Sequence, residues 1–168
     1  MNQCSGCCVG TTCEPLCGSA CCGASLECVG EALCCAPNSE PVAAILLQNN
    51  QWPASPGTIN ADATHYFRFA LTGPSDVSVL LDLVTGNADL SLVVKAGSAP
   101  TSAEYAGALA SSPTSSRSSC LWYAFESPGD YDESVTLSAV PAAEYFLLVH
   151  NRSASAATFR VGYVATPL

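Results

Sequence analysis

The cysteines of this chain are crowded at its N-terminus. Of the eleven cysteines in the 168-residue sequence, ten lie before residue 36 and the eleventh is Cys120. The ten are Cys4, Cys7, Cys8, Cys13, Cys17, Cys21, Cys22, Cys28, Cys34 and Cys35. A segment this short cannot bury enough apolar surface to offset the conformational entropy lost on folding, so it needs covalent or metal cross-links. The sequence therefore predicts a small cross-linked unit joined to a domain that folds around an ordinary hydrophobic core.

Disulfides are the predicted cross-links of this N-terminal unit. Such a density of disulfides persists only in an oxidising compartment, so we expect the protein outside the cell or on its surface. Zinc is the alternative because Cys4 and Cys7 form a C-x-x-C pair, but no second pair follows at zinc-finger spacing and the unit has no histidine. Redox catalysis by the same pair would need a βαβ context, which is missing. Glycine and serine separate the cysteines, which favours turns with little regular structure.

An odd number of cysteines leaves at least one thiol without a partner in the same chain. Cys120 is the candidate, because it lies far along the chain from the other ten. It is expected to be a buried free cysteine that packs as a small apolar side chain, or to form a bridge to another chain. The other possibility is that Cys120 pairs with the N-terminal unit, which leaves one cysteine there unpaired.

The chain carries few charges. Its net charge is −9 with only five basic residues, so the basic surface that nucleic acid requires cannot form. Charged residues make up 11% of the chain, well below the roughly 25% of typical soluble domains. The longest aliphatic run, residues 42–47, is far shorter than the roughly 20 apolar residues that span a bilayer. We therefore expect neither a nucleic-acid partner nor a membrane-spanning helix.

Apolar and polar residues alternate through most of the remaining sequence. The segments THYFRFAL, residues 64–71, and DVSVLLDL, residues 76–83, each place apolar side chains on one face of a strand. Further segments of this kind are residues 88–94, 120–126, 134–139, 143–151 and 157–165, with a weaker strand at residues 105–109. Short strands at this spacing, separated by turn residues and without a helical period, predict an all-β antiparallel sandwich.

The change of pattern sets the predicted domain boundaries. We expect a cysteine-rich, disulfide-stapled unit at residues 1–36, a linker with the first strand at residues 37–55, and a β-sandwich domain at residues 56–168. Proline, asparagine and serine at residues 36–41 are typical of a linker between such units.

Three stretches of the sandwich region resemble the bacterial pre-peptidase C-terminal domain. They are GTINADATHYFRFAL at residues 57–71, GNADLSLVV at residues 86–94, and DESVTLSAVPAAEYFLLVHNRSASAATFRVGY at residues 132–163. The sequence departs from the family in the serine-rich insertion around residues 100–118 and at Ala143 or Glu144, where a glycine is usual. The resemblance implies a jelly-roll-like sandwich that is not an enzyme and that serves export, substrate adhesion or surface display. The N-terminal unit resembles the cysteine-rich repeats of exported bacterial proteins.

Calcium is the one cofactor that the resemblance leaves open, because some relatives bind it. The oxygen-bearing candidates are Asp62, Asn87, Asp89, Asp130, Asp132 and Glu133. Calcium needs several carboxylate and carbonyl oxygens together, and no loop here has the dense Asp/Asn/Gly spacing of a dedicated site. The favoured interpretation is that these are polar turn residues.

Catalytic motifs are missing from the sequence. Only His65 and His150 could act as a base, and both lie in predicted strands or at their ends. Neither a nucleophile elbow, a phosphate loop nor a dinucleotide fingerprint occurs. We therefore predict that the protein is not an enzyme. Asn151-Arg152-Ser153 matches the N-glycosylation sequon, which in a bacterial chain is expected to arise by chance.

Two functions remain. The first is a non-catalytic extracellular binding or adhesion module that contacts a polymer or a protein surface. Its exposed aromatics would come from Trp52, Trp122, Tyr105, Tyr123 and Tyr131, which otherwise belong to the core and edges of the sandwich. The alternative is a structural subunit whose copies assemble into a filament or sheet, favoured by the low charge and the mean hydropathy of +0.28.

Overall fold

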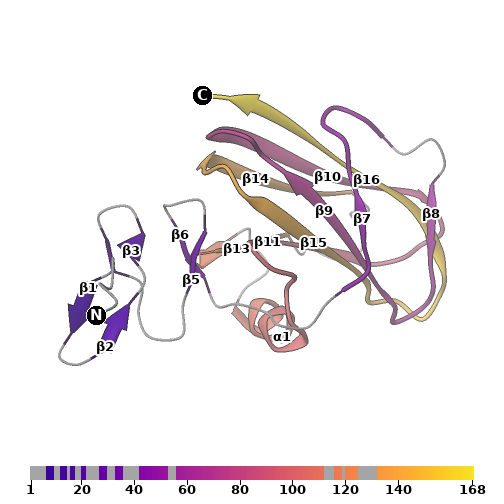
Figure 1. Ribbon diagram of the computed structural model, residues 1–168. Helices are drawn as coiled ribbons and strands as arrows, with labels where there is room; N and C mark the ends of the chain where they lie inside the picture. Colours follow the sequence, from indigo (N-terminus) through magenta and orange to yellow (C-terminus); the bar gives the residue numbers. More distant parts are fainter. Residues whose placement is uncertain are drawn as a thin grey trace.

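The computed structural model describes short strands between residues 7 and 35, and residues 42–52, 56–111, 116–118, 120–124 and 132–168. The N-terminal strands form three separate antiparallel pairs, at the left of Figure 1. The pairs are β1 (Cys7–Val9) with β2 (Thr12–Glu14), β3 (Leu16–Cys17) with β4 (Ala20–Cys21), and β5 (Glu27–Val29) with β6 (Leu33–Cys35). The cysteine-rich unit therefore contains paired strands of two or three residues in addition to the expected turns.

Two larger sheets form the sandwich. The four-stranded sheet has the order β14 (Glu133–Val140), β10 (Ser75–Thr85), β16 (Ala157–Pro167) and β8 (Gly57–Ile59). The six-stranded sheet has the order β12 (Ser116–Ser118), β13 (Leu121–Ala124), β11 (Leu90–Ala96), β15 (Glu144–Asn151), β9 (Thr64–Ala70) and β7 (Ala44–Leu46). All neighbours within these sheets are antiparallel except β7, which is parallel to β9. The predicted all-β sandwich is confirmed.

The chain crosses from one sheet to the other at most of its turns. From β8 to β11, and again from β13 to β16, each strand lies in the sheet opposite to that of the strand before it. This is the connectivity of a jelly roll. In β10, buried and exposed residues alternate from Ser75 to Leu81, so one face of the strand packs inward. The period of two in the sequence arises because one face of the strand is buried and the other is exposed.

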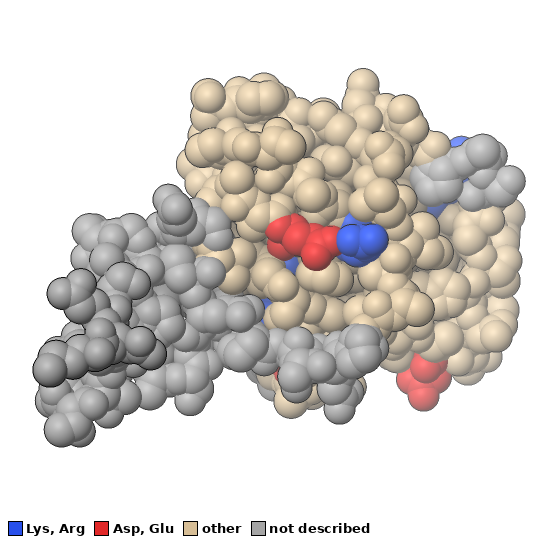
Figure 2. All heavy atoms as spheres, viewed as in Figure 1, with Lys and Arg blue, Asp and Glu red and all other residues tan. Residues whose placement is uncertain are grey.

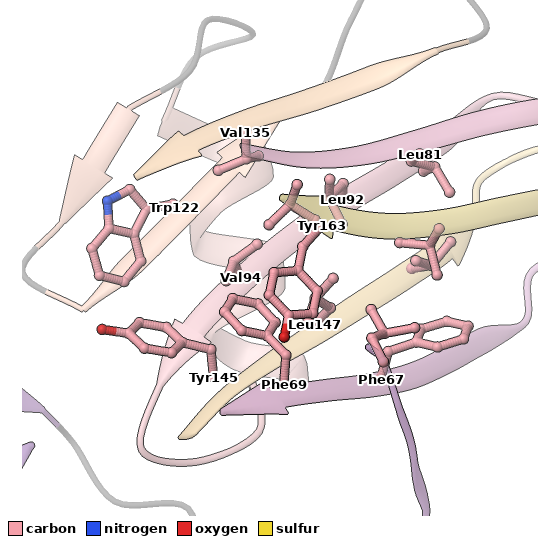
Figure 3. Packing of buried hydrophobic residues seen from close by; sticks show 14 of the residues in the cluster. Phe67, Phe69, Leu81, Leu92, Val94, Trp122, Val135, Tyr145, Leu147 and Tyr163 are labelled. Atoms are coloured by element: carbon pink, nitrogen blue, oxygen red, sulfur yellow. The ribbon is translucent and has the colours of Figure 1, made fainter. Parts of the chain in front are cut away.

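Aromatic side chains occupy the centre of the sandwich (Figure 3). The ring of Phe69 stacks between Tyr163, 4.3 Å away, and Tyr145, 5.2 Å away between centroids. The Tyr145 hydroxyl donates a hydrogen bond to the Pro141 carbonyl at 2.8 Å, which satisfies its polar end inside the core. Trp122 lies beyond Tyr145, with ring centroids 6.3 Å apart. These contacts join strands from both sheets.

The weaker strand expected at residues 105–109 is wrong, because these residues belong to helix α1 (Ser102–Ser111). Thr101 and Glu104 form a capping box: the Glu104 amide donates to Thr101 Oγ1 at 3.1 Å, and Glu104 Oε2 accepts the Thr101 amide at 2.8 Å. The helix covers the outer face of the six-stranded sheet, where Ala108 packs in a second cluster with Val93 and Leu148. The start signal T-x-x-E was present in the sequence, and the alanine-rich segment after it favours helix over strand.

The outer edge of the four-stranded sheet carries a β-bulge. Between the pairs Ser75–Val140 and Val77–Leu137, β14 has one residue more than β10. Ala139 adopts a φ of 50° there, and its amide donates to Asp76 Oδ1 at 2.8 Å. The bulge is therefore held by a side chain of the neighbouring strand.

In the part of the chain that the structure describes, no helix has the length and apolar character needed to cross a membrane.

Candidate binding surface

The structure separates the aromatic residues that were binding candidates. Trp122 and Tyr123 are buried, and Tyr105 is a half-buried residue of helix α1, whereas Tyr131 lies outside the described residues. Trp52, by contrast, is 47% exposed. Trp52 is thus the one member of this set in the described residues that presents a large aromatic surface to solvent.

Trp52 is held against the four-stranded sheet by the segment that precedes it. The segment contacts β16 from Asn49 onward, and the Asn50 amide donates to the Tyr163 carbonyl at 2.9 Å. Asn49 Oδ1 accepts the Ala165 amide at 2.9 Å. A Cβ atom placed on Gly162 would lie 3.4 Å from Trp52 Cε3, so the missing side chain lets the indole ring lie directly on β16.

The outer face of the four-stranded sheet surrounds this tryptophan. Leu80 lies opposite Gly162 across β10 and β16, and Val164 lies opposite Ser78 in the next pair. Leu80 and Val164 are both exposed. On the other side of β10, Ser134 and Thr136 pair with Leu80 and Ser78 and are also exposed. We call this surface the Trp52 face; it consists of Trp52, Ser78, Leu80, Ser134, Thr136 and Val164.

A charged pair flanks the Trp52 face. Arg160 lies two residues before Gly162 on β16 and is directly opposite Asp82 on β10. Arg160 is half-buried, and its Nε has no hydrogen-bond partner among the described residues. A buried donor of this kind is uncommon, because leaving it without an acceptor is unfavourable. Elsewhere the surface carries few charges, as Figure 2 shows for one side of the molecule.

The described calcium candidates are held by protein groups at separate places. Asp89 Oδ2 lies 3.6 Å from Arg152 Nη1, and Asp132 Oδ1 accepts the Leu83 amide at 3.2 Å. Asp62 Oδ1 lies 3.5 Å from the ring of His150. The remaining candidates are exposed Asn87, buried Glu133, and Asp130, which lies outside the described residues. Within the described residues, no three His, Cys, Asp or Glu side chains are grouped so that they could hold a metal ion.

Both histidines pack against aromatic side chains of the fold. The half-buried ring of His65 packs edge-on against Phe159, with centroids 5.9 Å apart. His150 Nδ1 lies 3.0 Å from Thr64 Oγ1, and its ring contacts Tyr105 edge-on at 5.1 Å. Burial raises the pKa of Tyr105, whose hydroxyl donates to the fully buried Ser91 at 3.4 Å. This cluster joins helix α1 to the six-stranded sheet.

The sequon asparagine is the centre of a hydrogen-bond network. Asn151 is 0% exposed, and its Nδ2 donates to the carbonyls of Asn60 at 3.1 Å and Ser155 at 2.7 Å. Its Oδ1 accepts the amide and the hydroxyl of Ser153, at 3.0 and 2.7 Å. Asn151 therefore ties the β8–β9 turn to the β15–β16 turn, and in the folded protein its amide is closed to glycosylation.

Cys120 is disulfide-bonded, so the prediction that it is a free thiol or bridges to another chain is wrong. Its side chain is buried in the main core cluster, which also contains Val29 of β5. The other ten cysteines all precede residue 36, so we expect the partner of Cys120 to be one of them. The alternative with an unpaired cysteine in that unit is thereby favoured. The side chains of those ten cysteines lie outside the described residues, and their pairing stays a prediction.

Comparison with known proteins finds similarity among solved structures. No family model matches the chain, and no curated protein matches it. Among solved structures, the chain is similar to the pre-peptidase C-terminal domain of collagenase from Bacillus anthracis. The identity is 12% and the TM-score 0.48, over 75% of this chain and 99% of that domain. The assignment of a β-sandwich therefore rests on the two sheets described above.

Proposed function

We propose that the chain is a non-catalytic binding module of an extracellular or cell-surface protein, and that it adheres to a polymer or protein surface through the Trp52 face. The observation that carries the proposal is the position of Trp52, which is 47% exposed and lies on Gly162 of a regular strand. Large aromatic side chains are enriched among the residues that dominate binding energies.

The surroundings of Trp52 support a role of this exposed side chain in binding. The Asn49 side chain and the Asn50 amide fix the segment to β16, so the indole is already ordered before a ligand arrives. Ordering a side chain on binding is unfavourable, and a pre-ordered ring avoids that loss. Exposed Leu80 and Val164 extend the apolar surface next to it. An apolar surface bordered by polar residues is typical of an interaction site.

The extracellular location is supported by the cysteines. A chain with ten cysteines before residue 36 depends on cross-links that an oxidising compartment preserves. The disulfide of Cys120 agrees with such a compartment.

Retention on insoluble polymers tests this function. The purified protein is mixed with chitin, cellulose, collagen and bacterial cell walls, with calcium and with a chelator, and the bound fraction is measured. Trp52→Ala is expected to lose retention, because it removes the aromatic surface. Leu109→Ala is the matched control, since Leu109 is an exposed apolar residue on helix α1, which covers the other sheet. Absence of retention on every polymer would contradict the proposal.

Self-assembly is the second candidate function. It is favoured by β7, an edge strand of the six-stranded sheet in which Ile45 and Leu46 are 60% and 51% exposed. Edge strands with apolar side chains are templates for pairing with another chain. Assembly predicts that the sedimentation coefficient rises with concentration and that Ile45→Lys abolishes the rise. A wild-type protein that stays monomeric at high concentration would remove this candidate.

A further inference from the structure

We infer that the ligand of the Trp52 face is a neutral, hydroxyl-rich carbohydrate polymer, one of whose sugar rings lies flat on the indole of Trp52. The inference rests on the proposed function and names its ligand class. It follows from three features: the orientation of the indole, the uncharged polar residues around it, and the charge of the chain.

The indole of Trp52 presents a flat surface. The ring atoms Cε3 and Cδ2 are 3.4 and 3.7 Å from the place of a Cβ on Gly162, so this part of the ring rests on the strand. Because the residue is still 47% exposed, a broad part of the ring system faces solvent. The C–H groups on one side of a pyranose ring make an apolar plate of matching shape, which packs against an aromatic face by dispersion.

The neighbours of Trp52 supply hydroxyl groups in place of charges. Ser78, Ser134 and Thr136 are exposed on β10 and β14, beside the apolar pair of Leu80 and Val164. From β14 to β16 the face spans two strand spacings, about 10 Å. Serine and threonine hydroxyls both donate and accept hydrogen bonds, as sugar hydroxyls do. Directly or through water, they can pair with the rim of a sugar whose apolar side covers Trp52.

Arg160 adds a charged donor group at the edge of the Trp52 face. Its side chain is only partly buried and lies opposite Asp82 on β10, whereas its Nε is shielded from solvent and takes no part in the proposed contact. A hydrogen bond to a guanidinium group is stronger than one between neutral groups. An Arg and an Asp next to an aromatic ring provide a donor and an acceptor for vicinal sugar hydroxyls. We therefore assign Arg160 and Asp82 to the binding site, at the end of the Trp52 face beyond Gly162 and Leu80.

The charge of the chain selects a neutral ligand. With a net charge of −9 and five basic residues in all, the protein repels acidic polysaccharides and nucleic acids. Asp82 and Arg160 flank the Trp52 face at one end and exposed Asp76 flanks it at the other, so the charges around it do not attract an acidic ligand. A neutral glycan meets no such repulsion, and its affinity is expected to depend little on ionic strength.

Tryptophan fluorescence tests this inference because the two tryptophans differ so strongly in exposure. Trp52 is 47% exposed and Trp122 is 5% exposed, so acrylamide should quench mainly Trp52. The probes are cellohexaose and chitohexaose, with an oligogalacturonate as the acidic arm and soluble collagen peptides as the protein arm. The two neutral oligosaccharides are expected to shift the emission to the blue and to protect Trp52 from the quencher. The acidic oligosaccharide is expected to do neither.

Variants locate the site. Trp52→Ala should weaken binding of chitohexaose at least about tenfold, and Trp52→Phe should weaken it less, since a smaller aromatic face remains. Arg160→Met should weaken binding, and Leu109→Ala should leave it unchanged. In the Trp52→Phe protein only Trp122 remains, so the oligosaccharide should no longer alter the quenching. A free energy of unfolding close to that of the wild type shows for each variant that the fold is intact.

The outcomes separate the inference from the function on which it rests. Retention on no polymer would overturn both. Retention on collagen alone, with Trp52 protected by the collagen peptides, would leave the binding function standing and overturn the carbohydrate ligand. Binding of neutral oligosaccharides that Trp52→Ala leaves unchanged would overturn the site. Binding of the acidic arm equal to that of the neutral arms would overturn the neutral ligand class.

Discussion

Lys95 Nζ lies 2.8 Å from Glu104 Oε1, and this ion pair joins the C-terminal end of β11 to the first turn of helix α1. Lys95 is 2% exposed, so its charge depends on Glu104 in a place that water hardly reaches. The pair thus fixes the helix against the outer face of the six-stranded sheet.

Glu104→Gln is expected to lower the free energy of unfolding by about 3 kcal/mol, because it leaves the charge of Lys95 buried without its partner. Thr101→Ala is the comparison variant: it removes both bonds of the Thr101 hydroxyl to Glu104 but leaves the ion pair with Lys95, and it should cost about 1 kcal/mol. Urea unfolding followed by circular dichroism measures both. Equal effects of the two substitutions would show that the ion pair adds nothing beyond the cap.

Asn151→Ala should destabilise the protein by about 3 kcal/mol, because buried carbonyls of two turns lose their donor. Asn151→Asp should be nearly as harmful, since a carboxylate cannot donate to Asn60 and Ser155. Asn87→Ala, at an exposed position in the turn after β10, is the control and should be nearly neutral. Protein secreted from a glycosylating host should carry no glycan at Asn151, which mass spectrometry of the folded material can verify.

Peptide mapping without reduction should find Cys120 linked to a peptide from the first 35 residues. Cys120→Ala is expected to lower the free energy of unfolding by about 4 kcal/mol, because the bridge closes a long loop. Val29→Ala tests the non-covalent part of the contact and should have a smaller effect. Labelling of Cys120 by iodoacetamide in the unfolded, unreduced protein would contradict the disulfide.

Gly162→Ala should displace Trp52 while leaving the core intact. The new methyl group would stand 3.2 Å from the Gln51 carbonyl and 3.4 Å from Trp52 Cε3, so the segment must move away from β16. Acrylamide quenching of the unliganded protein is expected to increase, and retention on the ligand to fall. Gly73→Ala is the control, because nothing lies within 4 Å of its added methyl group.

Alkaline pH should destabilise the protein through Tyr105 and Tyr163. Burial raises the pKa of both hydroxyls above their ordinary value of 10.0, so the folded state holds these protons more tightly than the unfolded state. The stability is therefore fully present below pH 10 and is lost as the pH rises further. Tyr105→Phe should flatten this loss in urea unfolding at pH 9 to about 11.5. If stability falls with pH as steeply in Tyr105→Phe and Tyr163→Phe as in the wild type, the two tyrosines are not its cause.

The strands of the sandwich could be read from the sequence because each keeps one buried face. The segments at residues 64–71 and 76–83 correspond to β9 and β10, whose inward residues follow the period of two. Helix α1 was missed because its few large apolar residues, Tyr105 and Leu109, also fit a short strand. The T-x-x-E sequence at Thr101 did indicate the start of a helix. The ion pair between Glu104 and buried Lys95 also stabilises that helix, and the local sequence pattern does not report it.

The candidate site was less predictable. In the sequence Trp52 is one of several aromatic candidates for binding. Which of them is exposed to solvent depends on contacts between distant segments, which the local sequence pattern does not reveal. Trp52 is exposed because Asn49 and Asn50 attach its segment to β16, more than a hundred residues later in the chain. The same holds for Asn151, because its buried position depends on two turns that are distant in the sequence and adjacent only in the folded protein.

The bulge at Ala139 limits how molecules of this protein can join. A kinked strand whose amide is already bound by Asp76 offers a poor template for a further strand, so the β14 side of the sandwich is protected against edge-to-edge growth. Strand addition is thereby left to the other edge strands of the described residues, β8, β12 and β7. Of these, β7 carries the exposed apolar side chains of Ile45 and Leu46, so a growing assembly would have a direction set by one sheet of the sandwich.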